Sequence, residues 1–184
     1  RTGISKRYFS AEDEFTSDLC VKAARNLESN YGKDLHDVDF ILVATATPDQ
    51  SMPNVASQVQ NKLGINTGVG AMDINTACSG FCYALTVARG LIMSGSASKV
   101  LVFGADEMSK ISDFSDRTTC ILFGDGAGCV LVEASDCDGI GEGITGTDGS
   151  YGKDLYVTTN SCCPTSENII PNGKIHQNGR VVYR

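Results

Sequence analysis

One cysteine lies where a strand-like run of residues gives way to a strongly helical one. We predict that Cys78 lies in the first turn of a helix, within the sequence Asp73-Ile74-Asn75-Thr76-Ala77-Cys78-Ser79-Gly80-Phe81. Unpaired backbone N–H groups and the positive end of the helix dipole there favour the thiolate, which is the nucleophilic form. Ser79 and Gly80 are small and would let a bulky substrate approach the sulfur. The alternative is that Cys78 is a buried structural cysteine, because free cysteine is among the most buried residue types.

A cysteine nucleophile normally has histidine as its general base, and the chain contains two histidines. His36 lies in a polar link between a predicted helix and a predicted strand, so we interpret it as a solvated residue. His176 lies in a segment, residues 174–179, that has the composition of a turn. Nothing near either histidine marks it as the partner of Cys78. The sequence therefore predicts a nucleophile without an evident base.

The eight cysteines do not form the pattern of a metal site. Cys78 and Cys82 are four residues apart and Cys162 and Cys163 are adjacent, whereas a structural zinc site takes two suitably spaced Cys or His pairs. We therefore predict no metal and assign Cys82 to the core. Because a chain of this length does not need disulfides to fold, we interpret the cysteines as reduced thiols of a cytoplasmic protein.

Two glycine-rich stretches lack the neighbours that a phosphate-binding site needs. Residues 141–146 match G-x-G-x-x-G, but no helical pattern follows them, so we predict a loop rich in turns and not a dinucleotide site. Residues 123–128 are not followed by Gly-Lys-Ser/Thr and so do not form a P-loop. Their glycines are expected to permit a tight turn.

The segments on either side of Cys78 predict an α/β fold. Helical patterns cover residues 12–30, 51–63 and 78–94, and apolar strand-like runs cover residues 40–46, 70–76 and 99–105. This β-α-β-α-β alternation implies a mainly parallel sheet with helices on both faces. The inward side of the third helix should carry Phe81, Leu85, Ala88, Leu91 and Ile92.

The pattern changes after residue 105. Apolar runs at residues 118–123 and 129–134, joined by the glycine-rich residues 124–128, predict an antiparallel hairpin. Residues 136–152 are rich in Gly and Asp and predict a connecting loop with short strands. The last thirty residues lack helical periodicity and end on a strand-like run, Val181–Arg184.

Composition excludes several classes of function. The net charge of −7 argues against a nucleic-acid partner, which would need a basic face. No run approaches the roughly 18 apolar residues of a membrane helix, and the first residues have no secretory signal pattern. A hydrophobic content of 41% is ordinary for a soluble globular protein.

Several motifs together are far more specific than any one of them. In chain order they are Arg1-Thr2-Gly3-Ile4 with Arg7, Ala46-Thr47-Pro48-Asp49 with Pro53, Asp73-Ile74-Asn75 before Ala77-Cys78-Ser79-Gly80-Phe81, Asp116-Arg117-Thr118, and Phe123-Gly124-Asp125-Gly126-Ala127-Gly128. Over essentially the whole chain they resemble the β-ketoacyl-[acyl-carrier-protein] synthase III family, which starts bacterial type II fatty acid synthesis.

The resemblance implies a thiolase-like fold, in which two similar β-α-β-α-β halves stack as five layers. Residues 1–135 would form most of the N-terminal half without its first strand. Residues 136–184 would form connecting loops and the start of a truncated C-terminal half. The family's catalytic His and Asn would then lie outside this chain, since His176 does not match that His. On this interpretation the chain is a fragment and is inactive alone.

The implied reaction is a decarboxylative Claisen condensation. The Cys78 thiolate would take the acyl group of a short acyl-CoA, which is typically acetyl-CoA in the family, and pass it to the carbanion formed from malonyl-acyl-carrier protein. The backbone N–H of Cys78 would donate to the oxyanion. Acyl-CoA is a substrate here, no cofactor or metal is implied, and the family is usually a homodimer.

Four further positions match substrate contacts of the family. Arg1 and Thr2 match coenzyme A contacts, and the guanidinium of Arg117 would lie against the adenine, since Arg both stacks and pairs with phosphate. The alternative for Arg117 is a solvated loop charge. Met52 matches a position, often Phe, that reaches across the dimer into the partner's acyl pocket. Because Met is flexible, it does not identify the acyl primer.

One segment departs from the family pattern, and two rival functions stay open. Ser161-Cys162-Cys163-Pro164 stands where the family usually carries a glycine-rich turn before a proline, next to the substrate entrance. One rival is a related condensing enzyme that loads a branched or longer acyl group. The other is a non-catalytic partner subunit, against which the retained Cys78 argues.

Overall fold

The computed structural model describes residues 3–137, 139–157, 173–178 and 182. The chain divides into two compact units, each assembled from separate stretches of sequence. The larger unit contains residues 10–106 and 126–145, and the smaller unit contains residues 1–9, 107–125 and 146–184. Among the described residues, no helix is both long enough and apolar enough to cross a membrane.

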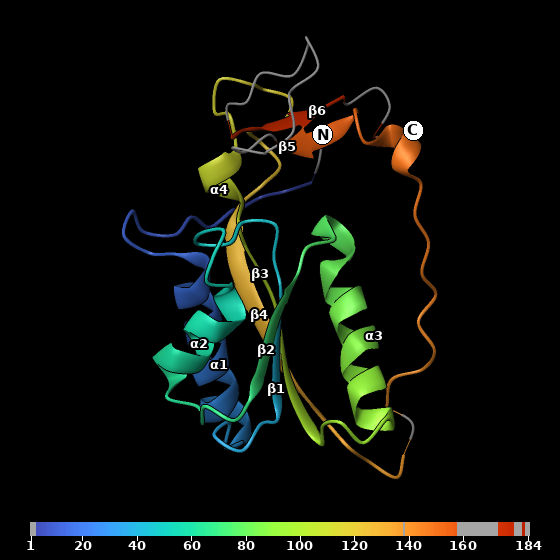
Figure 1. Cartoon of the computed structure of the whole chain (residues 1–184). Coiled ribbons are helices and arrows are strands. Elements are labelled where there is room, and N and C mark those ends of the chain that lie inside the picture. Colours follow the sequence, from blue (N-terminus) through green and yellow to red (C-terminus); the bar gives the residue numbers. More distant parts are fainter. Residues whose placement is uncertain (1–2, 138, 158–172, 179–181, 183–184) are drawn as a thin grey trace. The chain divides into compact units, whose positions relative to one another are not determined.

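The larger unit is built on a sheet in the strand order β2-β1-β3-β4 (Figure 1). The strands are β1 (Phe40–Ala44), β2 (Gly70–Ile74), β3 (Lys99–Glu107) and β4 (Asp125–Glu133). Strand β1 pairs in parallel with both β2 and β3, so that Leu42 lies opposite Met72 on one side and Val102 on the other. The predicted mainly parallel sheet is confirmed. Its central strand is the continuous apolar run, as expected for a strand buried on both faces.

Helices cover both faces of this sheet (Figure 1). Helices α1 (Thr16–Tyr31) and α2 (Val55–Leu63) pack on one face, and α3 (Gly80–Met93) packs on the other. Successive side chains of a strand point to opposite faces. Accordingly, Ile41 and Val43 join the core beneath α1 and α2, whereas Leu42 contacts the core beneath α3. The predicted inward residues of α3 all lie in that second core, with Ala84 and Ala88 completely buried.

The helix ends agree with the sequence prediction better than the helix starts do. Gly32 and Gly64 end α1 and α2 in the left-handed conformation that favours glycine. However, both helices begin four residues later than predicted, at Thr16 and Val55. At α2 the reason is Asn54, whose side chain accepts a hydrogen bond from the Ser57 N–H at 3.2 Å and so fixes the N-terminus there.

The predicted hairpin is wrong. Residues 118–123 form turns, and the strand β4 begins inside the glycine-rich stretch, at Asp125. The Ser109 N–H donates to the Asp125 carboxylate at 2.7 Å, just past the end of β3, and the Ala134 N–H donates to the Ser98 carbonyl, just before β3. Strand β4 therefore runs antiparallel to β3. Gly124 allows a close approach instead of a turn, because a Cβ there would lie 3.0 Å from the Tyr8 carbonyl oxygen.

The remaining regular structure is short. Among the described residues of 134–148 there is no strand, so the short strands predicted within residues 136–152 are not found there, and residues 141–146 lie in irregular structure as predicted. The smaller unit contains α4 (Met108–Ile111), a 3₁₀ turn at Gly149–Tyr151, and an antiparallel pair of strands, β5 (Leu155–Val157) and β6 (Ile175–Gln177). The segment containing His176 is therefore a strand and not the predicted turn. Residues 161–164, and the final run apart from Val182, lie outside the described residues.

Candidate active site

Cys78 lies in a 3₁₀ turn, Ala77–Ser79, that leads directly into α3. The α-helix itself begins at Gly80, two residues later than predicted. The Ser79 N–H donates to the Thr76 carbonyl at 3.2 Å, and the Gly80 N–H donates to the Ala77 carbonyl. The first backbone N–H groups of a helix have no partner inside the helix. The thiol therefore still lies at the N-terminal end of α3, where the helix dipole is positive.

The residue before the cysteine has a strained backbone. Ala77 has a φ of +46°, and among the described residues it is the one non-glycine residue with a positive φ. Such conformations cost about 1–3 kcal/mol and cluster at functional sites. Residues 75–79 are all exposed on the larger unit, so Cys78 is not part of the core of that unit. Cys82, which we assigned to the core, is also exposed, because it lies on the side of α3 away from the sheet.

Gly80 has a different role from the one that its size suggested. It is buried, and a Cβ at this position would lie 3.1 Å from the Cβ of Ala44 at the end of β1. The absence of a side chain thus lets the start of α3 approach the central strand closely. Ser79 alone of the two small residues is exposed beside the thiol.

Asp73 ties the strand before Cys78 to a helix distant in sequence. Its carboxylate accepts hydrogen bonds from the N–H groups of Val55 at 2.7 Å and Ala56 at 2.8 Å, at the start of α2. Burial raises the pKa of the Asp73 carboxyl, and the two hydrogen bonds act in the opposite direction. In the sequence, Asp73 stands out only as part of a motif. The available signal was an acidic residue within an otherwise apolar strand.

The loop between β1 and α2 carries Met52 at its exposed tip, where 83% of the Met52 surface is accessible. The start of the loop is held by Asp106 in β3, and Asp49 in the loop accepts hydrogen bonds from the N–H and hydroxyl of Ser17 at 2.9 and 2.5 Å. Met52 is therefore accessible from outside the larger unit. That it reaches into a partner's acyl pocket stays a prediction.

In the smaller unit, Arg117 is exposed on a turn that Asp116 organises. The Asp116 carboxylate accepts hydrogen bonds from the N–H and hydroxyl of Thr118, at 2.9 and 2.7 Å, and from the hydroxyl of Thr119. The hydrogen bonds from Thr118 hold the pKa of Asp116 below its ordinary value. Arg1 and Thr2, the other predicted coenzyme A contacts, lie outside the described residues.

The two histidines differ in their surroundings. His36 is exposed and its Nδ1 lies 2.9 Å from the Asp34 carboxylate, which agrees with a solvated residue. His176 stacks on Tyr156 with ring centroids 4.9 Å apart. Among the described residues, no group of three or more His, Cys, Asp or Glu side chains could hold a metal ion, and the described cysteines are free thiols.

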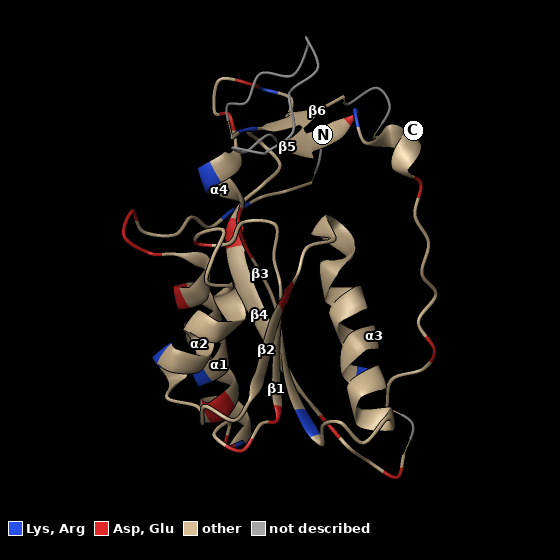
Figure 2. Ribbon diagram, in the orientation of Figure 1, with Lys and Arg blue, Asp and Glu red and all other residues tan. Residues whose placement is uncertain are grey.

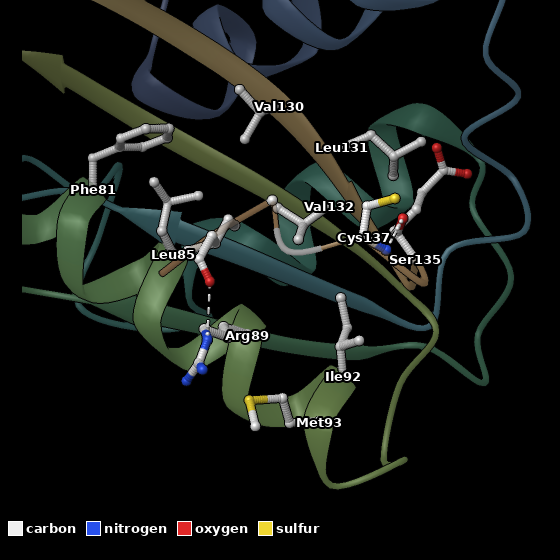
Figure 3. Close-up of a pocket in the computed structure, with 13 residues that line it drawn as sticks. Phe81, Leu85, Arg89, Ile92, Met93, Val130, Leu131, Val132, Ser135 and Cys137 are labelled. Carbon is white, nitrogen blue, oxygen red and sulfur yellow. Dashed lines mark hydrogen bonds between the residues drawn. The ribbon is translucent and has the colours of Figure 1, made fainter. Parts of the chain in front are cut away.

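A groove of about 500 Å³ lies between α3, β4 and the segment after β4 (Figure 3). Leu85 and Ile92 of α3 and Val132 of β4 line it, and the Arg89 Nε donates to the Ile140 carbonyl at its edge. Cys78 does not line this groove. Arg89 is the one charged residue of α3, which is otherwise uncharged in Figure 2. A helix that is apolar on all sides is normally buried in a larger protein.

Comparison with curated proteins identifies close relatives. Residues 72–149 match the family described as 3-oxoacyl-[acyl-carrier-protein (ACP)] synthase III. The whole chain is 47% identical over 185 residues to β-ketoacyl-[acyl-carrier-protein] synthase III 2 of Halalkalibacterium halodurans and covers 55% of it. It is 49% identical to the protein of the same name from Staphylococcus epidermidis and covers 56% of it. The chain thus spans about half the length of the curated relatives it matches.

Solved structures agree with these relatives. The β-ketoacyl-[acyl carrier protein] synthase III of Thermus thermophilus superposes with a TM-score of 0.87 at 39% identity, over 100% of this chain and 56% of that one. The priming β-ketosynthase of the R1128 polyketide biosynthetic pathway has a TM-score of 0.87 at 32% identity, over 100% of this chain and 55% of that one. The fold is therefore thiolase-like, as predicted. Over its whole length the chain is therefore similar to about half of the length of the curated β-ketoacyl-[acyl-carrier-protein] synthase III proteins, and residues 72–149 match the model of that family.

Proposed function

We propose that the protein carrying this chain starts fatty acid synthesis in the cytoplasm by condensing a short acyl-CoA, acetyl-CoA in the first instance, with malonyl-acyl-carrier protein. Cys78 is the observation that supports this most directly. Its thiol is exposed, follows the strained Ala77, and lies at the N-terminal end of α3. These are the features that a thiol nucleophile needs: access for the substrate and a positive end of a helix.

In the first stage, the Cys78 thiolate attacks the carbonyl carbon of the acyl-CoA thioester. A new bond forms between that carbon and the Cys78 sulfur, the bond to the coenzyme A sulfur breaks, and coenzyme A leaves as a thiolate that takes up a proton. The backbone N–H of Cys78 donates to the developing oxyanion. One such donor contributes about 3 kcal/mol in acyl-transfer enzymes.

In the second stage, malonyl-acyl-carrier protein loses CO₂, and the electron pair left on carbon attacks the carbonyl of the acyl group on Cys78. The bond between carbon and the Cys78 sulfur breaks, which frees the thiolate and releases 3-ketoacyl-carrier protein. The family's catalytic His and Asn, contributed from outside this chain, stabilise the enolate formed by decarboxylation. No cofactor takes part, because coenzyme A enters and leaves as substrate and product.

We assign substrate contacts to four residues. Arg1, Thr2 and Arg117 contact coenzyme A, and the exposed position of Arg117 on its ordered turn is compatible with stacking on an adenine. Met52 bounds the acyl pocket of the partner in a homodimer, which its exposure at a loop tip supports.

The rest of the protein packs on α3. Residues 1–135 form most of the N-terminal thiolase-like half and residues 136–184 lead into the C-terminal half. The nearly uncharged α3, exposed at Cys82 and Met93, supports this arrangement, because an all-apolar helix needs cover on every side. The 184-residue chain alone is accordingly expected to show no condensation.

Intact-protein mass spectrometry tests the role of Cys78 in the full-length protein. After exposure to acetyl-CoA, the wild-type protein and the matched control Cys82→Ser should gain the mass of one acetyl group, and Cys78→Ser should not. Equal acetylation of Cys78→Ser would falsify the mechanism. Labelling only by branched or longer acyl-CoAs would favour the related condensing enzyme. No labelling by any acyl-CoA would favour the non-catalytic subunit.

A further inference from the structure

We propose that Asp106 is a positioning residue that holds the loop between β1 and α2, residues 45–54, and thereby sets the place of Met52. The inference rests on the proposed function, because the place of Met52 affects catalysis only if Met52 bounds an acyl pocket.

One carboxylate oxygen of Asp106 holds the start of this loop. Asp106 Oδ1 accepts hydrogen bonds from the Thr45 hydroxyl at 3.2 Å, the Ala46 N–H at 2.8 Å and the Thr47 hydroxyl at 3.0 Å. Because β3 is the neighbour of β1, Asp106 near the end of β3 lies beside the point where the chain leaves β1. Thr45 and Thr47 are buried, so their hydroxyls need a partner within the protein.

The neighbouring contacts make these three residues a fixed anchor. The Thr45 N–H donates to the Ile74 carbonyl of β2 at 3.1 Å, and the Thr16 hydroxyl of α1 donates to the Thr47 carbonyl at 2.6 Å. The Thr47 N–H donates to the Thr45 hydroxyl at 3.0 Å. Asp106 accepts hydrogen bonds from all three residues, so its removal affects the whole anchor.

The far end of the loop has its own anchor, and the tip lies between the two. Asn54 and Asp73 hold the start of α2 through the Ser57, Val55 and Ala56 N–H groups. Residues 50–53, which include Met52, are exposed. With both ends held, the tip can occupy only a narrow range of positions. Loss of the Asp106 anchor widens the range of positions of Met52. A displacement of about 1 Å in a residue that positions a substrate can change the rate of the reaction strongly.

The experiment measures acyl-chain selectivity in the full-length enzyme. The quantity compared is the ratio of kcat/KM for butyryl-CoA to kcat/KM for acetyl-CoA. Asp106→Ala should raise this ratio about tenfold, the scale on which a pocket discriminates one or two methylene groups. Met52→Ala should raise it in the same direction. Asp106→Asn keeps an acceptor oxygen, so its ratio should stay close to that of the wild type.

A matched control is available at the opposite end of the sheet. Asp39 precedes β1 and accepts hydrogen bonds from the Ser98 and Lys99 N–H groups at 2.6 and 2.9 Å. Asp39→Ala also removes a carboxylate that holds backbone, but it should leave the selectivity ratio unchanged. A general loss of stability would change the selectivity ratio of both variants alike. A positioning role changes the ratio only in Asp106→Ala.

Other outcomes separate this inference from the proposed function. If the wild-type Cys78 is acetylated but the ratio is unchanged in Asp106→Ala, the positioning role is overturned. The same holds if Met52→Ala leaves the ratio unchanged. If Asp106→Ala does not fold, the shape-conserving double variant Thr45→Val with Thr47→Val takes its place and should raise the ratio about threefold. Amide hydrogen exchange at residues 46, 47 and 49–52 should accelerate in either variant even if no acyl-enzyme forms at all.

Discussion

The carboxylate of Asp73 lies 2.7 Å from the backbone nitrogen of Val55 and so joins the strand before the nucleophile to the first residue of α2. Its second oxygen accepts from the Ala56 N–H. Two of the four N–H groups that have no partner inside α2 are thereby satisfied by a residue of the neighbouring strand. This one side chain therefore links the start of α2 to β2, the strand that leads to Cys78.

Replacement of Asp73 by Ala should lower the free energy of unfolding by about 1–3 kcal/mol, because the N–H groups of two buried residues, Val55 and Ala56, lose their acceptor. Asp73→Asn keeps one acceptor oxygen and should lose less. Urea denaturation followed by circular dichroism measures both. If Asp73→Ala is as stable as the wild type, the two hydrogen bonds do not hold α2.

Replacement of Ala77 by Gly should raise the free energy of unfolding by about 0.5–1 kcal/mol. A left-handed conformation costs an L-residue about 1–2 kcal/mol, and glycine removes this strain. Part of the stabilisation is offset, because glycine loses more conformational entropy on folding than alanine does. Ala84→Gly, in the buried middle of α3, is the matched control and should destabilise by about 1 kcal/mol or more. Equal destabilisation by both changes would contradict the strain at Ala77.

The rate of alkylation should distinguish the exposed Cys78 from Cys20 and Cys129, which are shielded by the core. Burial raises the pKa of Cys129 to about 12 and raises that of Cys20 as well, so that neither thiol ionises at neutral pH. Iodoacetamide at pH 8 should label Cys78 in the native protein and leave Cys20 and Cys129 unlabelled, with peptide mass spectrometry as the readout. In guanidinium chloride all three should react, which controls for intrinsic reactivity. Rapid native labelling of Cys129 would be inconsistent with this core.

The turn that carries Arg117 should depend on pH through Asp116. The folded-state pKa of Asp116 lies below its ordinary value of 3.8, so its stabilising contribution is present above pH 3.8 and is lost as the pH falls through the folded-state value. In an NMR titration, the Thr118 amide signal should shift in that acidic window. Asp116→Asn should abolish the shift. An unchanged Thr118 signal across the window in the wild type would rule out this capping role.

The sequence predicted the elements of the larger unit because their signals are local. The continuous apolar run of β1 marks a strand buried on both faces, and glycines such as Gly64 mark helix ends through their own backbone conformation. The starts of α1 and α2 were placed too early. At α2 the start is fixed by Asn54, a local cap, together with the carboxylate of Asp73, which accepts from the first N–H groups and is distant in sequence.

The hairpin prediction failed for a related reason. Glycines at 124, 126 and 128 have the composition of a turn, but two of them lie within β4, which pairs with β3 and not with its sequence neighbour. Cys82 was assigned to the core because it lies in a mostly apolar helix, but it lies outside the predicted inward side of α3 and is exposed in this chain.

By itself, then, the sequence determined the alternation of strands and helices, the order of the family motifs and the identity of Cys78 as the nucleophile to propose. Only the tertiary structure decided the surroundings of that cysteine: the strained Ala77 before it, the close approach of Gly80 to Ala44 after it, and the Asp73 carboxylate that ties the preceding strand to α2. The physical reason is that each of these features is either a contact between residues on different elements or a backbone conformation that such contacts enforce. Neither leaves a pattern in the adjacent residues.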